Sequence, residues 1–128
     1  MNAQEIQKII DMFYYLDARV LSLSCDYFAD EVTLLYEDSE GNVRYIFTNC
    51  YDVSIKHSLK YDKLTSSRVM KYCQAPYQIP YYLQDVVVDE IEHEGIEFYK
   101  CKINMFPMFV EIMCKIINVS RVPKLKLK

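Results

Sequence analysis

Apolar and polar residues alternate along most of the chain between Arg19 and His57. Leu21, Leu23, Cys25 and Tyr27 fall on one side of the first run, and Ser22, Ser24 and Asp26 fall on the other. A period of two residues is typical of a half-buried strand. The same alternation recurs after Asp30-Glu31, where we expect a turn. We therefore predict antiparallel strands at about 18–27, 32–37 and 43–50.

The segment Asp38–Asn42 predicts the turn of a hairpin, because Gly41 and Asn42 tolerate a positive φ. After Tyr51-Asp52 the alternation resumes from Val53 to Ser58. This pattern fits either another strand or a continuation of the preceding strand past a bulge.

The N-terminal segment has the pattern of a short amphipathic helix. Asn2 followed by Glu5 resembles a capping box, and the apolar positions Ile6, Ile9, Ile10 and Phe13 recur at helical spacing. We predict a helix at about 3–15.

The second half of the chain predicts another hairpin and one ambiguous element. The run of valines in 85–91 predicts a strand, 92–95 a turn and 96–103 a second strand. Thr65 is a suitable N-cap for a short helix that includes Val69 and Cys73. Residues 108–119 fit a strand or a helix, and their β-branched content favours a strand.

The expected fold is α+β, with the N-terminal helix packed on a mainly antiparallel β-sheet of about six strands. With 128 residues, of which 52% are hydrophobic and only two are glycine, the chain fits one packed domain over 1–128. Residues 124–128 are basic and read as a frayed, solubilising tail rather than a membrane or nucleic-acid anchor.

The cysteine content indicates a reducing compartment. The five cysteines form no Cys-x-x-Cys pair and are odd in number, so we expect reduced thiols and a cytoplasmic protein. Cys25, Cys101 and Cys114 suit apolar strand faces. Charged residues interrupt the first eleven positions, so we expect neither a secretory signal nor a membrane span there.

The sequence contains no recognisable catalytic or cofactor-binding motif. His57 and His93, the only histidines, have no partner at a spacing typical of a nucleophile–base pair or a metal site. Glu90, Glu92, His93 and Glu94 are better explained as a solvated hairpin tip than as cation ligands. Two glycines leave little scope for a phosphate-binding loop, so we expect no cofactor and no metal.

Charge is unevenly distributed along the chain. Residues 1–60 hold ten acids and five bases, whereas residues 105–128 hold one acid and five bases. An acidic surface rich in tyrosine would repel nucleic acid and attract a basic protein. The alternative is that acids at strand ends serve solubility alone.

Three passages resemble small bacterial immunity proteins of polymorphic toxin and contact-dependent growth inhibition systems. They are Phe13–Val20, Asp30–Tyr36 and Tyr45–Phe47, with a later strand beginning at Tyr51-Asp52-Val53. The resemblance covers about half of the chain and implies a noncatalytic protein that binds a cognate toxin domain in the producing cell's cytoplasm. The resemblance does not indicate which residues of this chain would contact the toxin.

Our first hypothesis is a toxin-neutralising protein whose partner is basic, such as a nuclease. The candidate contact residues are acids at the two hairpins: Asp26, Asp30, Glu31, Asp38 and Glu40 from the first, and Glu90, Glu92 and Glu94 from the second. A second hypothesis is a small enzyme or ligand-binding domain with His57 or His93 in a pocket between helix and sheet. A third is a module that self-associates through an edge strand, as a homo-oligomer.

Overall fold

The computed structural model describes residues 2–58, 60–62, 67–70, 73–74 and 80–123. Helix α1 (Ala3–Met12) begins after Asn2, whose side chain accepts a hydrogen bond from the Glu5 amide at 2.9 Å, as a helix N-cap does. The strands follow in chain order: β1 (Val20–Asp26), β2 (Glu31–Asp38), β3 (Gly41–His57), β4 (Lys60–Asp62), β5 (Ser67–Met70), β6 (Cys73–Gln74), β7 (Asp85–His93), β8 (Ile96–Met105) and β9 (Met108–Val122).

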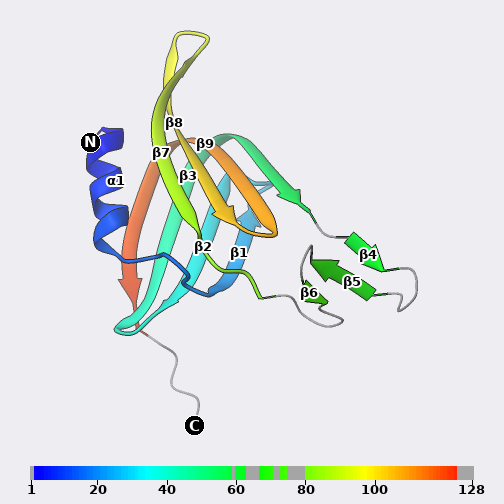
Figure 1. The fold of residues 1–128 in the computed structure, drawn as a ribbon. Coiled ribbons are helices and arrows are strands. Elements are labelled where there is room, and N and C mark those ends of the chain that lie inside the picture. Colours follow the sequence, from blue (N-terminus) through cyan, green and yellow to red (C-terminus); the bar gives the residue numbers. More distant parts are fainter. Residues whose placement is uncertain (1, 59, 63–66, 71–72, 75–79, 124–128) are drawn as a thin grey trace.

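The main sheet has six antiparallel strands in the order β1-β2-β3-β9-β8-β7, and β4, β5 and β6 form a separate small sheet (Figure 1). Helix α1 lies against β7 and β9. The α+β class and the six-stranded antiparallel sheet are therefore confirmed. No helix among the described residues is both long and apolar enough to cross a bilayer.

The two longest strands bend the sheet. β3 has 17 residues and β9 has 15, and their register shifts between Cys50 and Asp52. Asn49, just before the shift, has φ 52°. Before the bulge β3 pairs with both β2 and β9, and after it only with β9. The sheet therefore has two wings, one ending in β1 and the other in β7, that share β3 and β9 (Figure 1).

The core lies on one face of this bent sheet. Alternate residues of β2 and β3, namely Val32, Leu34, Tyr36, Val43, Tyr45 and Phe47, are buried there. Residues of the other wing, including Val86, Cys101, Ile103 and Ile112, join the same cluster, together with Ile6 and Ile10 of α1. The alternating apolar side chains of the strands and the apolar side chains at helical spacing in α1 are thus buried together in one core.

The outer edge of β7 is covered by the helix. The Gln7 side-chain amide donates to Val86 O at 2.9 Å, and its Oε1 accepts from the Val88 amide at 2.8 Å. One glutamine therefore replaces a neighbouring strand at this edge. The start of β1 is joined to the segment before β7 by a bridge between Arg19 and Tyr82.

Several local expectations are revised. The short middle helix is not seen, because Ser67–Met70 and Cys73–Gln74 are strands; Thr65 and residues 71–72 lie outside the described part. The prediction that Cys25 faces the core is wrong, since edge strand β1 leaves it exposed. The N-terminal helix ends at Met12 instead of residue 15, because Phe13 is extended. Residues 108–119 are strand, as favoured, and 53–57 continue β3 past a bulge.

Substituting the two glycines by alanine should have unequal effects on stability. Gly41 has φ 122°, and a Cβ there would lie 2.8 Å from Val122 O, whereas Gly95 has φ 79° and open space around it. We expect Gly41→Ala to lower the free energy of unfolding by roughly 2–4 kcal/mol and Gly95→Ala by about 1 kcal/mol. Urea denaturation of both variants measures these changes. Equal losses of unfolding free energy would contradict the idea that Gly41 is needed because its backbone lies so close to Val122 of β9.

Candidate partner-binding surface

The hairpin β7–β8 extends past the rest of the sheet. In chain order, the first residue of β8 that pairs with β9 is Tyr99, opposite Cys114. Ile96–Phe98 have no partner on β9, which continues to Val122 beside β3, so the tip of the hairpin separates from the sheet (Figure 1). Lys115 supports the projecting part, because its Nζ donates to Glu97 O at 2.6 Å. Glu94 and Gly95 form the turn, both at positive φ.

One face of this hairpin is acidic. Glu92 and Glu97 are directly opposite each other in the register, and both are exposed. Like charges at directly opposed positions destabilise a strand pair. Glu90, on the same face, accepts a hydrogen bond from the Ala3 amide at 2.8 Å and so holds the N-terminus of α1. Of the predicted acids, Glu92 and Glu94 are therefore exposed at the tip, whereas Glu90 has a structural bond.

The other face of the hairpin carries aromatic rings. The Tyr51 ring lies 5.2 Å from that of His93 and 5.1 Å from that of Phe98, and Lys115 Nζ lies 5.2 Å from the Phe98 centroid. Tyr51 belongs to the bulge of β3 and is 56% exposed. Sequence reasoning missed this cluster, since residues 51, 93 and 98 meet only because β3 bends beneath the hairpin.

The turn between β1 and β2 contacts the same bulge. The Cys50 amide donates to Asp30 O at 3.0 Å, so the turn contacts the residue next to Tyr51. Asp26 and Glu31 face each other across the end of this hairpin. The predicted acids Asp26, Asp30 and Glu31 are thus gathered at one end of β2. Asp38 lies at the other end, about 23 Å away for an eight-residue strand, and Glu40 follows it in the next turn.

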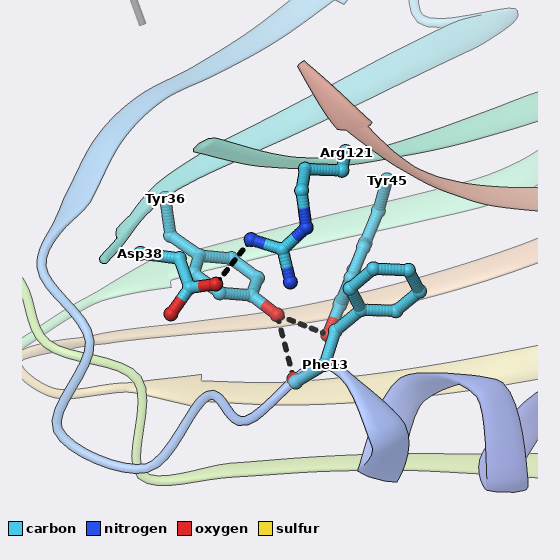
Figure 2. Close-up of polar contacts among 5 residues, drawn as sticks. All are labelled: Phe13, Tyr36, Asp38, Tyr45 and Arg121. Atoms are coloured by element: carbon cyan, nitrogen blue, oxygen red, sulfur yellow. Dashed lines mark hydrogen bonds and ion pairs between the residues drawn. The ribbon is translucent and has the colours of Figure 1, made fainter. Parts of the chain in front are cut away.

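Asp38 belongs to a structural network at that other end. It forms an ion pair with Arg121, whose guanidinium also lies 5.2 Å from the Phe13 ring centroid. Figure 2 shows the Tyr36 hydroxyl, which donates to Phe13 O at 2.9 Å and lies 3.3 Å from the Tyr45 hydroxyl. These contacts fix the end of α1 to β2, β3 and β9. Asp38 is therefore less suited to a partner than the hairpin acids.

The two histidines contact tyrosines. His57 Nε2 lies 2.6 Å from the Tyr81 hydroxyl, and the His93 ring lies beside that of Tyr51 with the two planes tilted by 50°. A hollow of about 320 Å³ beside β1 is lined by residues that include Leu21, Tyr81 and Met105, but by neither histidine. Within the described ranges, no group of three or more His, Cys, Asp or Glu residues is placed to ligate a metal.

Burial makes the core thiols poor nucleophiles. It raises the pKa of Cys50 to about 11 and that of Cys114 to about 12, and it also raises the pKa of Cys101. A protonated thiol is a weak nucleophile. Desolvation likewise raises the pKa of Tyr36 to about 12 and raises that of Tyr45.

Changing one acid of the opposed pair should stabilise the protein. Glu92→Lys would place an ammonium opposite Glu97, so we expect the free energy of unfolding to rise by about 0.2–1 kcal/mol. Urea denaturation at low salt measures this change. Glu92→Gln, which removes the repulsion without adding attraction, should give a smaller increase. A loss of stability in both variants would contradict the repulsion.

Stability should fall at alkaline pH because of the buried thiols and tyrosines. In the unfolded chain they ionise near the ordinary pKa values of 9 and 10, whereas in the folded chain these pKa values are raised. The folded state then binds more protons, so the free energy of unfolding should drop by about 3 kcal/mol or more between about pH 8 and pH 11. Urea denaturation under reducing conditions checks this. Tyr36→Phe should show a shallower decline above about pH 10, and a flat profile in the unaltered protein would contradict the mechanism.

Comparison with known proteins identifies the family. The profile of the family described as Immunity protein PIM7 matches residues 2–121. That range includes α1, all six strands of the main sheet except the last residue of β9, and both hairpins described above. No curated protein matches the chain significantly. The chain therefore belongs to the family Immunity protein PIM7.

Proposed function

We propose that this protein binds a cognate bacterial toxin domain and neutralises it without catalysis, through the surface at the projecting β7–β8 hairpin. The family supports an immunity role. The observation that carries the choice of surface is the opposed pair of exposed acids, Glu92 and Glu97, on the part of the hairpin that has separated from the neighbouring strand β9.

The charge of this surface favours a basic partner. The repulsion between Glu92 and Glu97 lowers the stability of the free protein, and a partner cation placed between the two carboxylates would relieve it. A nuclease is a suitable toxin, because a cleft that binds phosphates presents lysine and arginine side chains. The immunity protein would then compete with the nucleic acid for the same positive surface.

The aromatic side of the hairpin supports the same surface. Tyrosine is common at protein interfaces because it combines apolar area with a hydroxyl group. Tyr51 is exposed beside Phe98 and is held by ring contacts, so little side-chain freedom would be lost on binding. With acids on one face and aromatic rings on the other, the hairpin could contact a partner through both of its faces.

The expected setting is the cytoplasm of the bacterium that makes the toxin. A protein that protects its own cell must meet the toxin where the toxin acts, and a cytoplasmic nuclease target fits the reduced thiols. Such toxins occur in polymorphic toxin systems and in contact-dependent growth inhibition. A gene directly upstream that encodes a large secreted protein with a variable C-terminal domain would identify the partner.

Charge reversal on the hairpin should weaken toxin binding. Glu92→Lys/Glu97→Lys replaces one repulsive pair with another, so stability should change little while the surface becomes basic. We expect the affinity for the purified upstream-encoded toxin domain to fall by about tenfold or more, with the largest loss at low salt. Isothermal titration calorimetry at two salt concentrations measures this.

The matched control is Glu37→Lys/Glu40→Lys, at the β2–β3 end of the sheet. It makes the same change in net charge, and both acids are exposed. It should leave affinity within about threefold of the unaltered protein, because only distant, screened charges change. Equal losses in the two double variants would show that net charge and not the hairpin determines binding. Failure of the unaltered protein to bind the toxin would refute the proposed function.

A further inference from the structure

The β1–β2 turn has an unusual backbone for its sequence. Tyr27, Phe28 and Ala29 have φ values of 54°, 60° and 68° in succession. Residues with a Cβ are disfavoured in this left-handed region, and glycine, asparagine or aspartate normally occupy it. The β2–β3 and β7–β8 turns of this protein each have a glycine at positive φ, at Gly41 and Gly95. The β1–β2 turn has none.

The two aromatic side chains at this turn are exposed to solvent. Phe28 is 105% exposed and Tyr27 is 73% exposed, and Phe28 is the most exposed large apolar residue among those described. Nothing in the described core gains from either ring. An aromatic residue at position 28 therefore costs backbone strain and solvent exposure without contributing to the packing of the free protein.

The turn is nevertheless held in place. The Asp30 amide donates to Tyr27 O at 3.1 Å across the turn, and the Cys50 amide donates to Asp30 O at 3.0 Å. The second bond ties the turn to the bulge of β3. A ring held on a fixed backbone loses little conformational entropy on binding, as suits an anchor residue.

The charges around the ring indicate the partner. Asp26 and Glu31 are opposed in the register at the base of the turn, and Asp30 lies within it. The segment 26–31 contains no lysine or arginine. An apolar ring surrounded by carboxylates is complementary to an apolar pocket with basic residues at its rim.

We propose that Phe28 is an anchor residue that inserts into an apolar, basic-rimmed pocket of the toxin domain; this inference rests on the proposed function. The bulge of β3 contacts this turn through Cys50 and the β7–β8 hairpin through Tyr51. The toxin would therefore contact the protein at two hairpins that are supported by adjoining residues. Phe28 would supply apolar burial, and the acids of both hairpins would supply charge complementarity.

The test uses Phe28→Gly and Phe28→Ala with the purified upstream-encoded toxin domain. Glycine removes both the ring and the backbone strain, so the melting temperature should stay the same or rise while toxin affinity falls by about tenfold or more. Alanine removes the ring but keeps the strained backbone, and it should lose affinity to a similar extent. Tyr14→Ala removes another exposed aromatic residue, which lines a separate hollow with Glu37 and Asp38, and it should bind normally.

The outcomes separate this inference from the proposed function. Loss of affinity in both Phe28 variants, with retained melting temperature and normal Tyr14→Ala binding, supports the anchor. Unchanged affinity in the Phe28 variants, with toxin bound by the unaltered protein, overturns the anchor alone. No toxin binding by the unaltered protein overturns both. Sedimentation at micromolar concentration shows whether Phe28 instead joins two copies, and a dimer that Phe28→Gly dissociates would also overturn the anchor.

Discussion

The bend shared by β3 and β9 determines the rest of the architecture. Strands of 17 and 15 residues are long enough to pair with different neighbouring strands along their length. The register shift at Cys50 lets both strands change direction there. In the sheet, β2 and then β1 lie beyond β3, and β8 and then β7 lie beyond β9. The bend turns the apolar faces of both wings towards one core, so the core depends on the geometry of a few bulge residues.

The same bend determines where the surface features lie. The bulge presents its backbone to the β1–β2 turn at Cys50 and its aromatic ring to the β7–β8 hairpin at Tyr51. Two hairpins that are more than fifty residues apart in the chain are thereby supported by adjoining residues. The edge of β7 is covered by Gln7, so the exposed part of that hairpin is its projecting tip rather than its hydrogen-bonding edge.

Sequence patterns predicted the elements better than the site. All six strands of the main sheet were predicted: β1, β2 and β3 from alternation, β7 from its run of valines, β8 from the turn before it, and β9 from its β-branched content. The capping box at Asn2 identified the start of the helix, because a local hydrogen bond determines that feature. The prediction of a short middle helix was wrong, because a residue suited to an N-cap, such as Thr65, does not by itself make the following residues helical. Cys25 was misplaced because alternation cannot show that a strand lies at an edge and is left half unpacked.

The candidate site was harder to derive because it depends on long-range register. The acids were visible in the sequence, but that Glu92 opposes Glu97, or that Asp38 pairs with Arg121, follows only from strand pairing. The ring cluster of Tyr51, His93 and Phe98 left no local signal. Positive φ at Phe28 was likewise hidden, because the usual sign of such a turn is a glycine or asparagine.

The two ends of the sheet differ in backbone conformation and in how their acidic residues are paired. At the β2–β3 end, Gly41 has φ 122°, and Asp17, which lines a hollow with Asp38, is a residue other than glycine with positive φ, at 60°. The acid Asp38 is neutralised there by Arg121. At the bulge end, five described residues other than glycine adopt positive φ, namely Tyr27, Phe28, Ala29, Asn49 and Glu94. Two like-charged pairs, Asp26 with Glu31 and Glu92 with Glu97, are also opposed in the register there. Selection for stability alone would be expected to remove such features, since single substitutions to glycine or lysine would relieve them. Their concentration at one end is what a surface selected for binding would produce, because its charges and strained backbone are complementary to a partner and not to the protein itself.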